Sequence, residues 1–121
     1  MKDHGAVFLV SDDDFDEQVL RSELPVIVDF TAEWCPPCKA LNPVYAQLSL
    51  EYAEVLRFAS LDVDENVQTP VRYGIQGMPT LVMFQGGREV KRLIGPHPAR
   101  LKRLIEQVMT EVGAAASGER R

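Results

Sequence analysis

Residues 26–38 read Val-Ile-Val-Asp-Phe-Thr-Ala-Glu-Trp-Cys-Pro-Pro-Cys, and this stretch decides the fold. Its first five residues are apolar apart from Asp29, which is typical of a central strand covered on both faces. From Cys35 onward, apolar residues recur at helical spacing to about Tyr52, and Pro43 predicts a kink inside that helix. A buried strand that leads directly into a long helix indicates an α/β fold.

Strand and helix patterns continue on both sides of this stretch. Parallel crossovers come first and a hairpin comes last, so the order predicts a central mixed sheet of about five strands flanked by about four helices. The expected elements are a strand over 6–10, a helix over 13–22, the strand 26–30, the helix 35–52, a strand over 55–63, a short helix within 64–74, strands over 79–84 and 89–94, and a last helix through 101–112.

The length of 121 residues suits one domain, because a chain of this size buries enough surface to hold a core without disulfide staples. We expect this domain to cover residues 1–112. Residues 113–121 lack a burial pattern, which predicts a flexible C-terminal tail.

Composition excludes several classes of protein. Hydrophobic residues make up 45% and charged residues 26%, as in ordinary globular proteins. The net charge is −5 and no basic run precedes the last few residues, so nucleic acid is not an expected partner. No apolar stretch approaches the roughly 20 residues of a membrane helix. The apolar run over 6–10 is shorter than that of a signal peptide, so a cytoplasmic location is expected.

The only two cysteines, Cys35 and Cys38, lie three positions apart. A disulfide that closes so small a loop constrains the unfolded chain little, so the pair predicts redox chemistry or a metal site before a structural staple. Structural zinc needs four ligands, and neither His4 nor His97 has ligand spacing. We therefore expect redox chemistry, with no bound cofactor or metal beyond the cysteine pair itself.

The position of the pair at a helix start predicts which cysteine reacts first. Residues three apart on a helix have Cα atoms roughly 5 to 6 Å apart, within disulfide reach. Free amides and the positive end of the dipole favour a thiolate at Cys35, so Cys35 is the predicted nucleophile and Cys38 the resolving thiol. Pro36 and Pro37 stiffen the loop but remove two amides, which leaves those of Cys38 and Lys39 as the nearest donors.

Asp29 is a carboxylate in an otherwise apolar strand. Burial of a carboxylate raises its pKa, which suits a general base that works near neutrality. The alternative is a structural aspartate hydrogen-bonded to a backbone amide, as buried polar groups usually are.

A wider set of residues resembles the thioredoxin family in order and spacing over about residues 8–109. This resemblance implies the thioredoxin fold and a thiol–disulfide oxidoreductase that reduces protein disulfides, with roles in electron transport and cell redox homeostasis. The residues that carry it are Val28-Asp29-Phe30, Ala32-Glu33-Trp34-Cys35-Pro36-Pro37-Cys38-Lys39, Pro43, Asp62-Val63-Asp64, Tyr73-Gly74-Ile75, Gly77-Met78-Pro79-Thr80, Phe84 and Gly95.

The resemblance also implies roles for individual residues. Cys35 matches the exposed nucleophile, Cys38 the resolving thiol, and Asp29 the proton relay, while Pro79 matches the family's cis-proline. The implied partners are disulfide-containing proteins and a thioredoxin reductase, and we expect the chain to act as a monomer. The implied substrate-binding surface consists of Trp34, Pro36, Pro37, Ile75, Gly77, Met78, Pro79 and Gly95.

Three positions depart from the family pattern. Pro36 replaces the usual glycine, and Cys-Pro-Pro-Cys also occurs in tryparedoxin-like and nucleoredoxin-like relatives. Ser60 replaces a lysine that neighbours the buried carboxylate, so the pKa of Asp29 is expected to rise further. Thr31 stands where a second aromatic is common, and we expect looser packing around the loop.

Other functions remain open on sequence alone. The direction of electron flow depends on potential and compartment, so a disulfide oxidase or isomerase and a tryparedoxin-like electron carrier are alternatives. A fold does not by itself determine a function. A non-redox binding module that uses the rim of Trp34, Ile75, Met78 and Pro79 is a further alternative.

Overall fold

The computed structural model describes residues 5–120, with side chains described through residue 112. A five-stranded sheet with the order β1-β3-β2-β4-β5 forms its centre. The first three of these strands are parallel, while β4 is antiparallel to both β2 and β5. The predicted mixed sheet is therefore confirmed. The strands are β1 (Phe8–Leu9), β2 (Val26–Thr31), β3 (Arg57–Asp62), β4 (Thr80–Gln85) and β5 (Arg88–Ile94).

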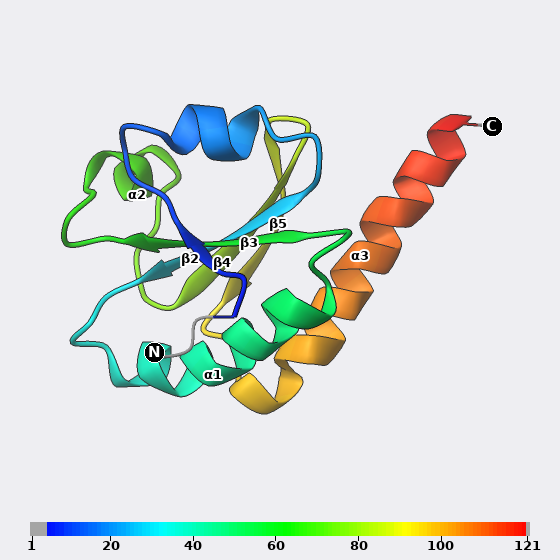
Figure 1. Ribbon diagram of the computed structural model, residues 1–121. Coiled ribbons are helices and arrows are strands. Elements are labelled where there is room, and N and C mark those ends of the chain that lie inside the picture. Colours follow the sequence, from blue (N-terminus) through cyan, green and yellow to red (C-terminus); the bar gives the residue numbers. More distant parts are fainter. Residues whose placement is uncertain (1–4, 121) are drawn as a thin grey trace.

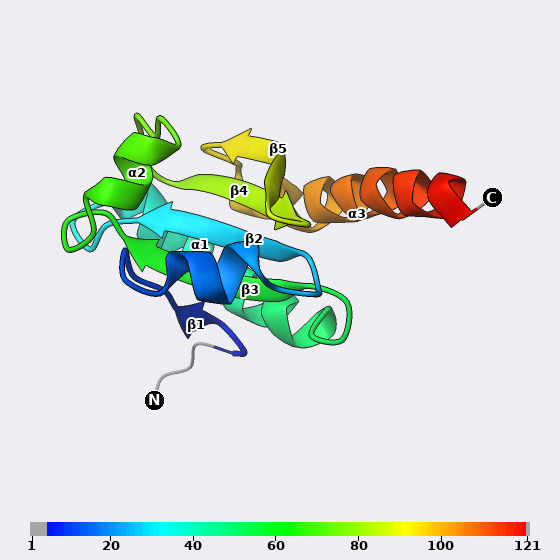
Figure 2. The same cartoon turned by 90° about the horizontal axis from the view of Figure 1, so that it is seen from above.

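Helical segments cover both faces of the sheet. Figure 1 shows α1 and α3 below it and η1, a short π-helical segment drawn in blue, above it with α2. Figure 2 gives the same layers from above. The four segments are η1 (Asp16–Leu20), α1 (Pro36–Glu51), α2 (Gln68–Arg72) and α3 (Pro98–Arg120).

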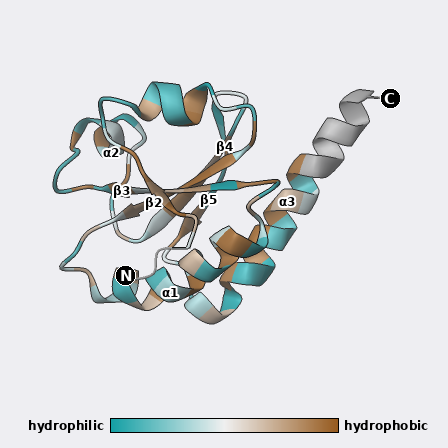
Figure 3. Ribbon diagram, in the orientation of Figure 1, coloured by the Kyte–Doolittle hydropathy of each residue, from teal (hydrophilic) through white to brown (hydrophobic). Residues whose placement is uncertain are grey.

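The two-sided apolar pattern of β2 places a core on each face of the sheet. Ile27 packs with α1 and α3, whereas Val28, the next residue, packs on the face that η1 covers. In Figure 3 the strands are mainly brown, while the outer helix surfaces are largely teal. Burial of both sheet faces explains why β2 reads as a continuous apolar run.

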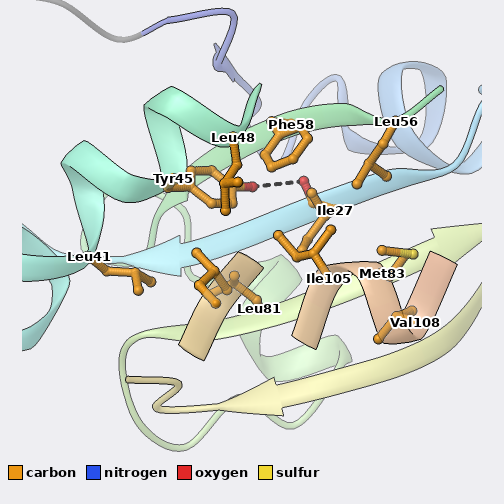
Figure 4. Close-up of a cluster of buried hydrophobic side chains, with 11 residues drawn as sticks. Ile27, Leu41, Tyr45, Leu48, Leu56, Phe58, Leu81, Met83, Ile105 and Val108 are labelled. Carbon is orange, nitrogen blue, oxygen red and sulfur yellow. Dashed lines mark hydrogen bonds between the residues drawn. The ribbon is translucent and has the colours of Figure 1, made fainter. Parts of the chain in front are cut away.

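The Tyr45 side chain brings a hydroxyl group into the core under α1 and α3. The Tyr45 hydroxyl lies 3.0 Å from the carbonyl oxygen of Ile27 and 2.7 Å from that of Ala59, as part of the packing in Figure 4. One hydroxyl has a single proton to donate, so the two carbonyls share it. This hydroxyl therefore ties α1 to the two central strands.

Several element boundaries differ from the predictions. The first strand spans only Phe8–Leu9, and before it the Ala6 amide donates to the Ser49 hydroxyl on α1 instead of to β3. The last helix continues to Arg120, beyond the predicted end near Val112. The side chains of 113–120, and residue 121 itself, lie outside the described part of the chain, so the flexible tail over 113–121 stays a prediction. None of the helices within residues 5–120 combines the length and apolarity needed to cross a bilayer.

Candidate active site

The cysteine pair lies where β2 passes into α1. Cys35 is the N-cap of α1, with extended backbone, and Pro36 and Pro37 occupy the first positions of the helix. Prolines are tolerated there because first-turn amides have no partner within the helix. The predicted stiff helix start is thus present.

Cys35 and Cys38 form a disulfide with a Cα–Cα distance of 5.3 Å, within the range that helical spacing predicts. The Cys38 amide donates to Cys35 Sγ over 3.3 Å, as expected. The Lys39 amide does not, because it donates to the Cys35 carbonyl oxygen at 3.1 Å and closes the first helical turn. The prediction of Lys39 as a second nearby donor was therefore wrong.

Both cysteines are more enclosed than the resemblance implied for the nucleophile. Cys35 is 3% exposed and Cys38 is 0% exposed in this disulfide form. Cys35 is nevertheless the cysteine of the pair that retains some accessible surface.

Asp29 is buried and has no neutralising partner. The residue is 1% exposed, and its Oδ1 atom has no hydrogen-bond partner among the described residues. Burial raises the pKa of Asp29 from 3.8 to about 7. The expected rise in the pKa of Asp29 is confirmed. The alternative was an aspartate hydrogen-bonded to a backbone amide, and among the described residues no such amide reaches Oδ1.

The surroundings of Asp29 explain why nothing offsets this burial. Side chains alternate along a strand, so Asp29 shares the face of Ile27, which α1 covers. Its cross-strand neighbour on β3 is Ser60, which carries no charge. Burial and the Asp29 carboxylate raise the pKa of Tyr45 on α1 well above 10. Asp29 and α1 therefore lie close enough to interact.

The loop before β4 approaches the cysteine pair from the other side. The Met78–Pro79 peptide bond is cis, as the resemblance implied. The Met78 carbonyl oxygen lies 3.6 Å from Cys35 Sγ, and the Gly95 amide donates to the Pro79 carbonyl oxygen at 2.9 Å. The tertiary structure thus brings the segments around residues 35, 78 and 95 together.

The predicted surface residues do not all lie in one environment. Trp34 is 63% exposed, while Met78 is half-buried and packs against the cysteines. Pro79 is buried, and Ile75 packs against the core that η1 covers rather than against the cysteine cluster. The other predicted surface residues are exposed, namely Pro36, Pro37, Gly77 and Gly95.

Two residues at the site belong to the set that carries the family resemblance, yet no role at the site was predicted for either. Val63 packs against the small cluster of Ala32, Cys35 and Cys38. Asp64 accepts a hydrogen bond from the Trp34 indole N–H at 2.7 Å. Both follow β3, which is parallel to β2, and parallel strands end at the same edge of a sheet. That rule could have indicated both residues from the sequence.

The chemistry available at the site is that of its cysteine pair. Within the described residues, no three or more His, Cys, Asp or Glu side chains gather in a way that could hold a metal ion. Cys35 and Cys38 form a disulfide, which a thiol can open and close reversibly by exchange.

Comparisons with known proteins agree with this geometry. The family model described as Thioredoxin matches residues 6–107. The chain is 49% identical over 83 residues to the thioredoxin of Acidithiobacillus ferridurans, covering 69% of this chain and 77% of the relative. It is 46% identical over 89 residues to that of Synechocystis sp., covering 74% and 83%. The crystal structure of Malassezia sympodialis thioredoxin (Mala s 13) aligns with a TM-score of 0.78 at 35% identity, covering 88% and 94%.

Proposed function

The chain belongs to the thioredoxin family and is a thiol–disulfide oxidoreductase that reduces protein disulfides, and we propose that Cys35 begins the exchange and Cys38 completes it. The observation that carries this proposal is the disulfide across the first turn of α1. No cofactor takes part in the exchange, because the electrons reside on the cysteine pair.

In the first step, the Cys35 thiolate attacks one sulfur of a substrate disulfide. The substrate S–S bond breaks, a mixed disulfide forms, and one substrate thiolate leaves. The Cys38 amide at 3.3 Å and the positive end of α1 support a thiolate at Cys35. The small accessible surface of Cys35, against none at Cys38, supports the same order.

In the second step, Cys38 loses its proton and attacks Cys35 Sγ. The mixed disulfide breaks, the second substrate thiol leaves, and the Cys35–Cys38 disulfide forms, so two electrons and two protons pass to the substrate in total. We assign Asp29 as the base that takes the Cys38 proton, because a buried carboxylate with a pKa of about 7 can accept and return a proton near neutrality.

The surface around the pair supplies the substrate contacts in this proposal. Trp34 offers an exposed aromatic face that Asp64 holds in place. The loop at Met78 supplies an adaptable apolar contact beside Cys35. The complete proposed surface is Trp34, Pro36, Pro37, Ile75, Gly77, Met78, Pro79 and Gly95.

Single-cysteine variants test the order of the two steps. Cys38→Ser should accumulate a mixed disulfide between Cys35 and a protein substrate, because no thiol remains to release it. Cys35→Ser should accumulate much less, because Cys38 is fully buried. Trapping by Cys35→Ser rather than by Cys38→Ser would reverse the assignment.

The pH dependence of exchange tests Asp29. Asp29→Asn should remove the part of the rate profile that titrates near pH 7 and should slow release of the mixed disulfide. A profile identical to that of the wild type would exclude Asp29 as the base.

The cellular setting is part of the proposal. We propose that a thioredoxin reductase restores the dithiol and that the chain acts as a monomer in the cytoplasm. All cysteines of the chain belong to the redox pair, so none is left for a structural disulfide of the kind common in oxidising compartments. The dithiol potential measured against glutathione tests the reducing role, and the location of a tagged chain tests the compartment. A potential well above that of the glutathione pool would favour an oxidase role instead.

A further inference from the structure

Met78 lies directly beside the redox pair. Its half-buried side chain packs against the cluster of Ala32, Cys35 and Cys38. Its carbonyl oxygen lies 3.6 Å from Cys35 Sγ, so backbone and side chain both adjoin the reacting sulfur. A change in the chemistry of this side chain would therefore be felt at the exchange site.

The side of Met78 that faces away from the cysteines is open to small solutes. Gly77 precedes it and Gly95 lies beside the same loop through its bond to Pro79. Both glycines are exposed, and a methyl group at either would meet no atom within 4 Å apart from its neighbours in the chain. Met78 itself is only half-buried, so a molecule as small as hydrogen peroxide can approach its side chain.

The other methionines of the described chain lie away from this site. Met83 on β4 is 2% exposed in the core under α1 and α3. Met109 on α3 is half-buried against the same core. Burial limits the approach of an oxidant to Met83, whereas Met109 is about as exposed as Met78 but lies away from the cysteines. Met78 differs from them in being next to the redox pair and beside an open glycine surface.

We propose that Met78 is an oxidation site, at which hydrogen peroxide forms methionine sulfoxide and slows disulfide exchange. The thioether sulfur gives two electrons to the peroxide, the O–O bond breaks, one S–O bond forms and water leaves. The sulfoxide is polar, and methionine sulfoxide reductases convert it back to methionine, so the modification can be undone. Its effect on exchange rests on the proposed function, in which Met78 contacts substrate.

The expected effect follows from the apolar surroundings of the side chain. Met78 shares its contacts with Val63 and the cysteine cluster. A sulfoxide in that contact, or facing an apolar substrate group, leaves a polar oxygen without a partner. We expect exchange to slow by about three- to tenfold, in line with the cost of an unpartnered polar group at a partly buried site.

Peroxide treatment of the disulfide form oxidises the methionines without oxidising the cysteines further. Without a thiolate, Cys35 and Cys38 cannot enter the cysteine oxidation series. After the peroxide is removed, peptide mass analysis measures oxygen addition at each methionine, and a small dithiol then restores the pair for the exchange assay. The samples are wild type, Met78→Leu and, as a matched control away from the site, Met109→Leu, because Met-to-Leu exchange nearly conserves volume.

Each treated protein is compared with its own untreated rate. We expect Met78 to gain oxygen several-fold faster than Met83, and the wild type and Met109→Leu to lose exchange rate while Met78→Leu keeps its own. Oxidation of Met78 no faster than of Met83 would overturn the inference. An equal loss in treated Met78→Leu would also overturn it, because the damage would then lie elsewhere, such as at Trp34. The rates of untreated Met78→Leu and untreated wild type, compared with each other, test separately whether Met78 contacts substrate as the proposed function requires.

Discussion

The pH dependence of stability gives a quantitative test of the buried carboxylate. Asp29 has a pKa of about 7 in the folded protein because burial penalises its charged form, while the unfolded chain has the ordinary value near 3.8. Such a difference corresponds to about 4 kcal/mol when both states are fully ionised. Asp29→Asn removes the titration while nearly keeping the side-chain shape.

The sign follows from which state holds the proton. Below about pH 3.8 Asp29 is protonated in both the folded and the unfolded protein, so its ionisation does not change the free energy of unfolding. Between pH 3.8 and 7 the folded state keeps a proton that the unfolded state has lost, so stability falls by about 1.4 kcal/mol for each pH unit. Above pH 7 both states are ionised and the cost stays constant. Asp29 therefore destabilises the folded protein progressively as the pH rises to 7.

Chemical denaturation of the disulfide form at about pH 5, 6, 7 and 8 measures this cost. The free energy of unfolding of Asp29→Asn minus that of the wild type should grow by about 2 kcal/mol from pH 5 to 7 and then level off. Asp13→Asn, which changes an exposed carboxylate, serves as the control. Titration of all other groups cancels in the difference. A difference that stays constant within about 0.5 kcal/mol over this range would refute the assignment of a raised pKa to Asp29.

Three other changes test contacts around the site. Pro36→Gly restores a first-turn amide and should lower the pKa of the Cys35 thiol, measured by thiol reactivity against pH in the reduced protein; an unchanged or higher value would contradict the expectation. Asp64→Ala should release the indole of Trp34, seen as a shift in its fluorescence, with a stability loss of only about 0.5–1 kcal/mol because the pair is exposed. Tyr45→Phe leaves two buried carbonyls without their shared donor and should cost about 1–3 kcal/mol by denaturation, and a neutral result would show that the hydroxyl is dispensable.

Some features of the site could be predicted because they depend on neighbouring residues along the chain. The Cα separation of Cys35 and Cys38 is a property of helical spacing, and the prolines between them suit a helix start wherever it lies. The apolar run around Asp29 indicates burial on both faces without any knowledge of what covers it. Local patterns therefore predicted the reacting pair, the central strand and the raised pKa.

Other features depended on which segments meet. The contact of Met78 with the cysteines joins positions 40 or more apart in the chain, as does the short pairing of the first strand with β3. The Lys39 amide was wrongly predicted as a thiolate donor, because closing the helical turn engages it with the Cys35 carbonyl. Ile75 was predicted as part of the substrate-binding surface, and the structure packs its side chain against the core that η1 covers, which a matching motif could not reveal.

The sequence by itself determined that two cysteines would lie one helical turn apart at the end of a buried strand, because both patterns arise from backbone periodicity. Only the tertiary structure decided what surrounds them. It encloses Cys38 completely, leaves Asp29 Oδ1 without a partner among the described residues, and packs Met78 against the cluster that contains the pair. These properties come from desolvation and contact by distant segments, which depend on how the elements pack and not on the order of residues within any one of them.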